Sequence, residues 1–239
     1  MPEPATLPTP PPPTVRLGGA PDSTRLIFVL VTMGFSTVDD LVAYFLHSDK
    51  GWLIASALTV VLLAAILGFI VHYRDELFAR LFVFGLFAGF AELPSDHYAV
   101  GVLKIMVYPL QGPFIWSSPL YMPFSYIIVM VQLGYLGYWF TQRWGLLWAT
   151  VAIAALGGVN VPLYEYLAKR AEFWYYQDCH MLFGTVPYIT IFAETFFSLV
   201  LPFLVSLLLR VSWPVVALLG VLEGAWMFVL FYFGFKLTG

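Results

Sequence analysis

The residues that could do chemistry in this sequence are acids placed within apolar segments or at their ends. The clearest case is the stretch 85–98, where an apolar run carries Glu92 and then Asp96 and His97. An ionised acid in hydrocarbon costs about 3 kcal/mol or more unless it is neutral, paired or facing a cavity. We therefore take Glu92 and Asp96 as candidate catalytic residues.

Further acids occupy comparable positions. Asp39 lies beside Asp40 in the second half of the first apolar segment, where both could equally sit at the water interface, and Glu165 ends the fifth segment. Glu194 lies about 11 residues into the sixth segment and Glu223 about ten residues into the seventh, so both fall near mid-membrane at ~1.5 Å per residue. Asp39, Glu165 and Glu194 are further catalytic candidates, whereas Glu223 could serve helix packing alone.

Buried acids of this kind suit proton-transfer chemistry. An acid held in an apolar cavity keeps its proton near neutral pH and can act as a general acid. Aromatic faces stabilise developing positive charge by cation–π attraction of about 0.5–2 kcal/mol each. The combination suits protonation of an alkene or epoxide, followed by cyclisation, isomerisation or hydration. The candidate substrate-binding residues are Trp116, Tyr121, Asn160, Trp174, Tyr188 and His97. An aromatic belt at the membrane interface is the alternative role for the Trp and Tyr side chains.

Other chemistries find little support in the sequence. The four histidines show no HxxxH, HExxH or CxxC spacing of the kind that zinc sites use. There is no GxSxG element of a serine hydrolase and no Gly-rich phosphate loop. The single cysteine, Cys179, excludes an intramolecular disulfide, and the net charge of −3 argues against a nucleic-acid partner. We expect neither a metal nor a cofactor.

The elements that position these residues belong to a membrane domain. Hydrophobic residues make up 61% of the 239 residues, charged residues 10%, and the mean hydropathy is +0.85. Apolar runs of about 20 residues match a hydrocarbon core of ~30 Å. The composition predicts an all-α, polytopic bundle of about seven transmembrane helices. Residues 1–22 hold eight of the 17 prolines and are predicted to form a disordered tail, and 23–239 a single transmembrane domain.

The sequence predicts seven spans. They cover 25–47, 52–73, 77–93, 119–140 and 144–166, and two more begin near 183 and 213. Pro94 is expected to break the helix after the third span. The connections 94–117 and 169–181 are long and rich in aromatic and polar residues. For 94–117 this character indicates an ordered lid or re-entrant lining.

Alternating the spans up and down separates acids from arginines. One end of the bundle receives Asp39, Asp40, Glu92, Asp96, Asn160, Glu165, Glu172 and His180. The other end receives Arg74, Arg80, Arg143 and Arg210. We interpret the first end as the mouth of a polar cavity into which Glu92 and Glu194 project. With the N-terminus at the arginine end, six basic residues against five favour a cytoplasmic N-terminus.

The order of these features resembles small integral-membrane isoprenoid enzymes, namely the membrane-bound terpene cyclases and the carotenoid hydratases. The similarity lies in an acid-bearing span, an aromatic loop and a Pro-containing span, then Trp174-Tyr-Tyr and Thr185-Val-Pro187-Tyr188. The segments 157–165 and 187–202 are also similar to the emopamil-binding sterol isomerases. The resemblance covers roughly 80–205 and implies acid–base chemistry on isoprenoid or sterol substrates by Glu92, Glu165 and Glu194. The His and Glu pair on one early span of the sterol isomerases is missing, unless His97 supplies the histidine.

The sequence thus predicts a cofactor-independent integral-membrane enzyme acting on a hydrophobic isoprenoid or sterol-like lipid. A proton-coupled transporter or a lipid-binding protein is the alternative, because buried acids also form proton relays. A repeat between the two halves would favour transport, and the sequence shows none. A photoreceptor-like protein is a third interpretation, but the last span offers only Lys236, at its end, for a Schiff base.

Overall fold

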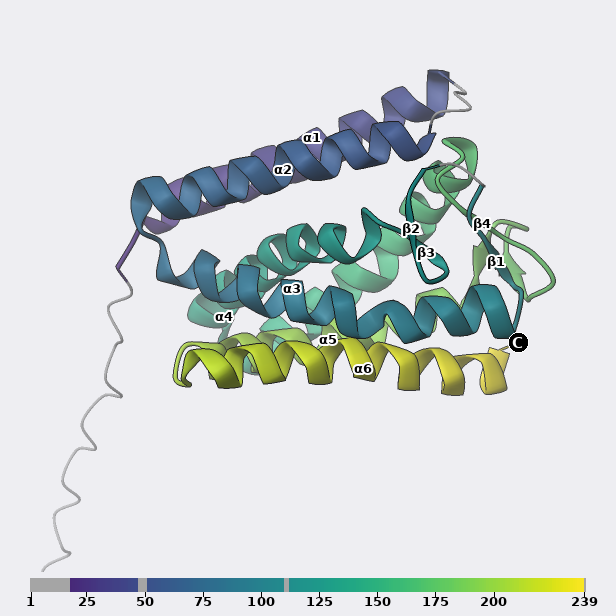
Figure 1. Cartoon of the computed structure of the whole chain (residues 1–239). Helices are drawn as coiled ribbons and strands as arrows, with labels where there is room; N and C mark the ends of the chain where they lie inside the picture. Colours follow the sequence, from purple (N-terminus) through teal and green to yellow (C-terminus); the bar gives the residue numbers. More distant parts are fainter. Residues whose placement is uncertain (1–17, 47–50, 110–111, 239) are drawn as a thin grey trace, which may run out of the picture.

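The structure is a computed structural model that describes residues 18–46, 51–109 and 112–238. Within these ranges six helices are each long and apolar enough to cross a membrane (Figure 1). They are α1 Asp22–Leu46, α2 Gly51–Tyr73, α3 Glu76–His97, α4 Met122–Arg170, α5 Tyr188–Leu208 and α6 Trp213–Thr238. This is the architecture of a multi-pass membrane protein. Most of the predicted disordered tail, up to residue 17, lies outside the described residues.

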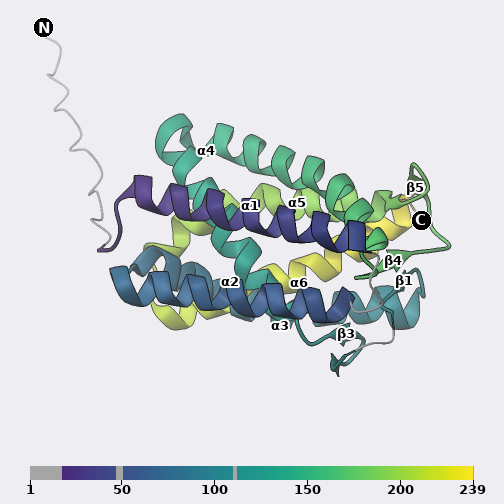
Figure 2. The same ribbon diagram turned by 90° about the horizontal axis from the view of Figure 1, so that it is seen from above.

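Helix α4 contains both of the spans that the sequence predicted as separate, and they meet at a kink. It is 49 residues long, and its backbone leaves helical geometry at Gly145, with φ of 79° and ψ of 166°. Glycine reaches this conformation of positive φ because it has no Cβ. The beginning of α4 packs against the second half of α3, where a Cβ on Gly89 would collide with the carbonyl of Pro123. Figure 2 shows α4 reversing its direction along its length.

Helix α3 packs mainly against α4 and α6. In Figure 1 the pair α1 and α2 lies on one side of it and α6 on the other. Gly220 and Gly224 of α6 face α3 so closely that a Cβ on either would collide with a carbonyl oxygen, that of Phe84 or Ala88. Small residues four apart allow this approach in membrane helices. Glu223, adjacent to Gly224, is thereby held in the interior and is only 3% exposed.

The expected break at Pro94 is wrong. Helix α3 continues through Pro94 to His97 and then into a π-helical turn, Tyr98–Val102. The Tyr98 N–H donates to the carbonyls of both Pro94 and Ser95, which carries the helix past the proline. Prolines are more frequent in membrane helices than in soluble ones, so this continuation is compatible with a transmembrane helix. The consequence is that Asp96 follows Glu92 by about one turn of the same helix.

Three pairs of two-residue strands close one end of the bundle, and they are the only strands among the described residues. They are β1 Met106–Val107 with β4 Tyr175–Tyr176, β2 Phe114–Ile115 with β3 Ser118–Pro119, and β5 Met181–Leu182 with β6 Val186–Pro187. The β1–β4 pair joins the two long connections that the sequence analysis singled out. It also brings the last turn of α4 beside the segment that follows α3, so both ends of α4 lie at this end of the bundle.

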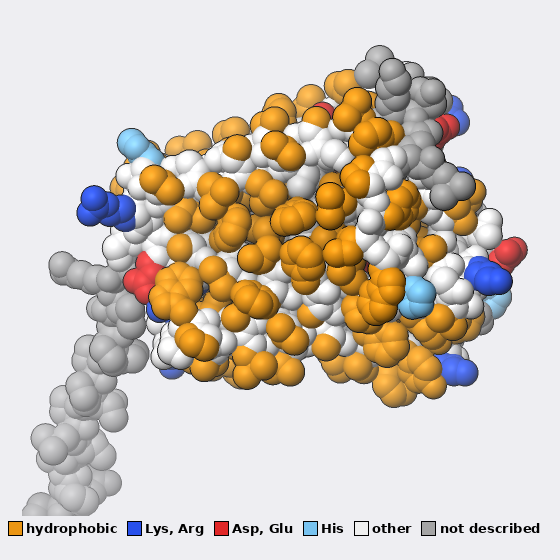
Figure 3. Space-filling view, in the orientation of Figure 1, with side chains coloured by type: hydrophobic (Ala, Val, Ile, Leu, Met, Phe, Trp, Pro, Cys, Tyr) orange, Lys and Arg blue, Asp and Glu red, His pale blue; other side chains and the backbone are white. Residues whose placement is uncertain are grey.

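The surface is apolar between two charged ends. In Figure 3 hydrophobic side chains cover the middle of the visible face, and charged side chains gather toward its left and right ends. Val31 of α1 is 63% exposed and Val71 of α2 is 74% exposed. Apolar side chains this open to the surroundings are expected where helices face lipid.

Candidate functional site

Four carboxyl side chains converge at the end of the bundle that carries the strands. Glu92 and Asp96 come from α3, Glu165 from the last two turns of α4, and Glu194 from α5. Glu92 lies within electrostatic range of Asp96 and Glu194, and Glu165 within range of Glu194 and Asp96. Glu92, Asp96 and Glu165 are buried, and Glu194 is half-buried. We name these four residues the carboxylate cluster.

One of the two carboxyl oxygens of Glu92 lacks a hydrogen-bond donor among the described residues. Glu92 points the same way as Asp96 because residues four apart share one helix face. Tyr126 of α4 lies next to it. Its Oε2 atom is buried and accepts no hydrogen bond from any described residue. A buried carboxyl with one unpartnered oxygen and a second acid beside it is expensive as an anion, so this position suits a carboxylic acid that carries its proton.

Asp96 has the opposite surroundings. Its Oδ2 accepts a hydrogen bond from the Tyr108 hydroxyl at 2.9 Å and another from the Ser118 hydroxyl. Tyr108 follows β1 and Ser118 begins β3, so the loop between α3 and α4 folds back over the acid. Burial first, and then the charge of Asp96, raise the pKa of Tyr108 well above its usual 10.0, so Tyr108 stays a proton donor. Two donors on one oxygen suit a carboxylate that accepts protons.

Glu165 is held by Trp174. The indole Nε1–H donates to Glu165 Oε2 at 2.7 Å within the buried interior. The Trp174 ring meets the Tyr108 ring at 6.3 Å and an interplanar angle of 68°, an edge-to-face contact. The register of β1 with β4 produces this contact because it pairs Val107 with Tyr175, the neighbours of the two rings. Tyr108 and Trp174 therefore connect the two acids at opposite sides of the cluster.

Three other acids lie at the margins of the cluster. Glu223 of α6 is buried within electrostatic range of Glu194, and its Oε1 has no hydrogen-bond partner among the described residues. Asp39 is half-buried and Asp40 buried on α1, where both lie within range of Tyr164. Glu223 thus extends the cluster toward α6, while Asp39 and Asp40 lie on its α1 side, behind Tyr164.

The predicted substrate-binding residues divide into three groups. Trp174 and Tyr121 are buried, and burial followed by Asp96 raises the pKa of Tyr121. His97 and Trp116 stack outside the cluster, with ring centroids 5.1 Å apart and planes 14° apart, and His97 Nδ1 lies 2.8 Å from Ser117 Oγ.

Asn160 and Tyr188 form the third group, which faces outward. Both side chains are exposed, Tyr188 to 44%. Neither is brought to the carboxylate cluster, because each belongs to the outer face of its helix.

Three residues of the site escaped the sequence analysis: Tyr108, Ser118 and Tyr126. Each is brought to an acid by the fold of the loop between α3 and α4 or by the packing of α4 on α3. The only sequence signal was the aromatic and polar character of 94–117, which indicated an ordered lid without saying which side chains face inward.

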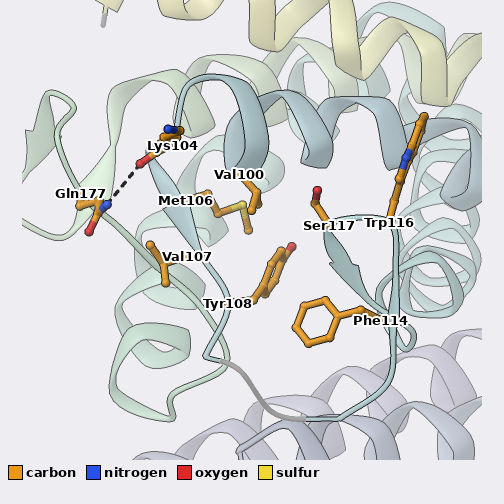
Figure 4. Close-up of a pocket in the computed structure, with 9 residues that line it drawn as sticks. All are labelled: Val100, Lys104, Met106, Val107, Tyr108, Phe114, Trp116, Ser117 and Gln177. Carbon is orange, nitrogen blue, oxygen red and sulfur yellow. Dashed lines mark hydrogen bonds between the residues drawn. The ribbon is translucent and has the colours of Figure 1, made fainter.

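A pocket of about 470 Å³ lies at the loop between α3 and α4 (Figure 4), and one of its lining residues, Tyr108, is hydrogen-bonded to Asp96. Its lining includes Val100, Lys104, Tyr108, Phe114, Trp116 and Gln177. We name it the loop pocket. Tyr108 belongs to both the loop pocket and the carboxylate cluster, because its ring lines the first and its hydroxyl binds Asp96 in the second. Among the described residues no group of three or more His, Cys, Asp or Glu side chains is arranged to hold a metal ion.

Comparison with known proteins places the chain in a family without assigning it an activity. No curated protein and no solved structure matches it. A family model matches residues 93–238, a region that contains Asp96, Glu165, Glu194 and the loop pocket. The chain therefore belongs to the family described as domain of unknown function (DUF6989).

Proposed function

We propose that this protein is a cofactor-independent membrane enzyme that protonates an isoprenoid-type lipid and so cyclises, isomerises or hydrates it. The observation that carries the proposal is the carboxylate cluster itself. Four acids meet inside an apolar bundle, and the ion pairs among the described residues all involve other side chains. Acids gathered without cations suit proton transfer better than structural pairing.

The hydrogen-bond pattern supports a division of roles. Glu92 gives its proton to one carbon of a substrate double bond, whose electron pair forms the new C–H bond and leaves a carbocation on the other carbon. Faces of Tyr126 and Trp174 stabilise that cation. A second double bond of the chain attacks it in a cyclisation, or water adds in a hydration. Asp96 or Glu165 then removes a proton and the product is neutral.

The geometry also supports return of the proton. After cyclisation or isomerisation Glu92 is ionised and its neighbour carries the proton that left the substrate. Asp96 lies about one helical turn from Glu92, so the proton can pass back within the cluster. The reaction then consumes no proton and requires no cofactor.

The proposal includes seven membrane crossings. Both ends of α4 lie beside the strands, and its backbone leaves helical geometry only at Gly145. At ~1.5 Å per residue, each half of α4 is close to the thickness of the hydrocarbon core. Two crossings by α4 would place the carboxylate cluster and the ends of α3 and α4 at one side of the membrane.

Deuterium transfer tests the function whichever lipid is the substrate. Purified protein in phospholipid nanodiscs is incubated in D₂O with the lipid extract of its source membrane, and the lipids are analysed by mass spectrometry. Wild-type protein should place deuterium on carbon in one isoprenoid lipid. Glu92→Gln keeps the shape but removes the proton, so the rate should fall by about 10²–10⁴. Glu165→Gln and Glu194→Gln should also lower it.

Glu172→Gln is the matched control, because Glu172 is exposed at the same end of the bundle. Its rate should equal that of the wild type. Full deuterium transfer by all three cluster variants would overturn the enzymatic proposal.

A proton-coupled transporter is the second candidate, and one observation favours it. Buried or half-buried acids of α6, α5 and α3 follow one another from Glu223 through Glu194 and Glu92 to Asp96, each within electrostatic range of the next. Such a series can carry protons. Loss of proton uptake into liposomes in Glu194→Gln, with no deuterium on any lipid in the wild type, would favour transport over catalysis.

A further inference from the structure

The loop pocket has the character of a site for an amphipathic molecule. One part of its lining is apolar and aromatic and is formed by Val100, Phe114 and Trp116, while Lys104 and Gln177 supply polar groups. Figure 4 shows Lys104 and Gln177 on one side of the pocket and Trp116 on the other, with the Tyr108 ring between them. Its volume of about 470 Å³ falls in the range of small-molecule sites, roughly 300–1,000 Å³.

Lys104 is the only cation in the lining of the loop pocket. It is exposed at the rim and forms no ion pair with any described acid. Gln177, which directly follows β4, donates from Nε2 to the Lys104 carbonyl at 3.3 Å. This hydrogen bond links the rim of the pocket to the connection between α4 and α5. A cation at the rim of a pocket that also has aromatic rings in its lining provides a place for a negative group attached to an apolar body.

The backbone at the rim holds these side chains in an unusual geometry. Lys104 has φ of 57° and Trp116 φ of 60°, both in the left-handed region that residues with a Cβ seldom adopt. Backbone conformations of this kind persist where the surrounding structure enforces them and are concentrated at ligand sites. Both residues line the same pocket, one on each side.

Tyr108 connects the loop pocket to the chemistry. Its ring forms part of the pocket lining, and its hydroxyl donates to Asp96 Oδ2 at 2.9 Å. A molecule in the pocket therefore touches a side chain that is bonded to the carboxylate cluster. Tyr108 is a positioning residue for Asp96.

We propose that the loop pocket binds the head of an anionic isoprenoid lipid, with the negative group at Lys104 and the first isoprene units against Phe114 and Trp116. The inference rests on the proposed function and adds to it the charge of the substrate and the place where its head is recognised. The shared wall at Tyr108 keeps the bound head next to Asp96.

A second hollow on the molecule supplies the control. Trp144, Trp148, Val151, Ala152 and Ala155 of α4 line a pocket of about 460 Å³. It has nearly the same volume and also contains tryptophan, but its lining has no charged side chain. Trp148→Ala therefore matches Trp116→Ala in the atoms removed and differs in the pocket affected.

Binding of two lipids that differ in charge tests the inference. Farnesoic acid and farnesol are titrated at neutral pH onto the full chain in phosphatidylcholine nanodiscs, and affinity is measured by equilibrium partition of radiolabelled lipid. Farnesoic acid should bind about tenfold more tightly than farnesol, which corresponds to one favourable charge contact. Lys104→Met should remove this preference. Trp116→Ala should weaken the binding of both lipids about tenfold, and Trp148→Ala should leave both affinities unchanged.

The outcomes separate the pocket from the catalysis. Equal binding of the two lipids, or a preference for farnesoic acid that survives in Lys104→Met, overturns the inference, and so does equal weakening by Trp116→Ala and Trp148→Ala. The expected binding pattern in a protein that places no deuterium on any lipid would uphold the pocket and reject the proposed enzyme. Deuterium transfer by a protein that lacks the expected binding pattern would uphold the proposed enzyme and reject the role of the loop pocket.

Discussion

The two ends of the bundle treat buried charge in opposite ways. At the arginine pole, which comprises Asp22, Arg25, Asp75, Glu76 and Arg80, opposite charges pair. Arg25 Nε lies 2.7 Å from Asp75 Oδ2, and Arg80 Nη1 donates to the Leu208 and Val211 carbonyls at 2.7 Å each. At the carboxylate cluster four acids face one another, and none of them forms an ion pair with a described Lys or Arg.

This contrast separates structure from function. At the arginine pole the contacts join α1, α3 and the turn between α5 and α6, so their charges hold the bundle together. Acids that face acids in an apolar interior lower stability, because like charges repel and neither is solvated. Removing a charge at the arginine pole should therefore lower the stability of the fold and have little effect on activity. Removing a charge at the carboxylate cluster should lower activity and leave the fold stable.

Asp75→Ala should produce the largest loss of stability. Asp75 Oδ2 accepts from the Ala20 N–H at 3.0 Å and from Arg25 Nε at 2.7 Å, and Oδ1 accepts from the Phe78 N–H at 3.0 Å. The variant leaves Arg25 buried without its principal partner, which should lower the free energy of unfolding by about 3–5 kcal/mol. Thermal unfolding in detergent, followed by circular dichroism, measures the loss.

Two variants complete this comparison. Glu76→Gln removes a half-exposed partner of Arg80 and should cost less than about 1 kcal/mol. Glu92→Gln should leave the unfolding temperature unchanged or raise it, because it removes an acid that has no described donor at Oε2. A Glu92→Gln protein as unstable as Asp75→Ala would contradict the division between the two poles.

The fold was predictable where hydrophobicity alone decides it. Long apolar runs predicted the helices, and alternation of spans placed Glu92, Asp96 and Glu165 at one end, where the structure has them. The sequence did not reveal that the helix passes Pro94, because a proline is an ordinary signal for the end of a helix, whereas this helix continues to His97 and into a π-helical turn. Nor did it show that residues 141–144 remain helical and that only Gly145 interrupts α4.

The acids of the site were predictable and their partners were not. An acid in an apolar run is visible in the sequence because its desolvation demands an explanation. The donors Tyr108, Ser118 and Trp174 reach Asp96 and Glu165 through short strand pairs between distant segments. Two-residue strands leave no alternation of apolar and polar residues to detect. Trp174 was chosen only for its aromatic ring, whereas its N–H is the group that the site uses.

Trp174→Phe should have the next largest effect, and it tests whether the cluster has any stabilising contacts of its own. Phenylalanine keeps an aromatic ring against Tyr108 but cannot donate to Glu165 Oε2. Loss of a hydrogen bond to a buried acid should cost about 1.5–3 kcal/mol of stability, with a fall in the deuterium-transfer rate. Trp148→Phe, on the exposed surface of α4, is the matched control and should change neither quantity. Unchanged unfolding and rate in Trp174→Phe would remove Glu165 from the site.

The smallest effect is a shift in the titration of Cys179, which reports the charge around the carboxylate end without touching the cluster. Burial, followed by the charge of Asp178, raises the pKa of the Cys179 thiol from 9.0 to about 11. Because the thiolate is the reactive form, its reaction with a small methanethiosulfonate reagent in detergent should be slow at neutral pH and should rise with pH toward a midpoint near 11. Asp178→Asn removes the second cause and should lower the midpoint slightly, whereas Asp75→Asn at the arginine pole should leave it where it was. A cation lowers the pKa of a nearby thiol, so a midpoint below the ordinary value of 9.0 would reveal positive charge at this end and would contradict the comparison drawn between the two poles.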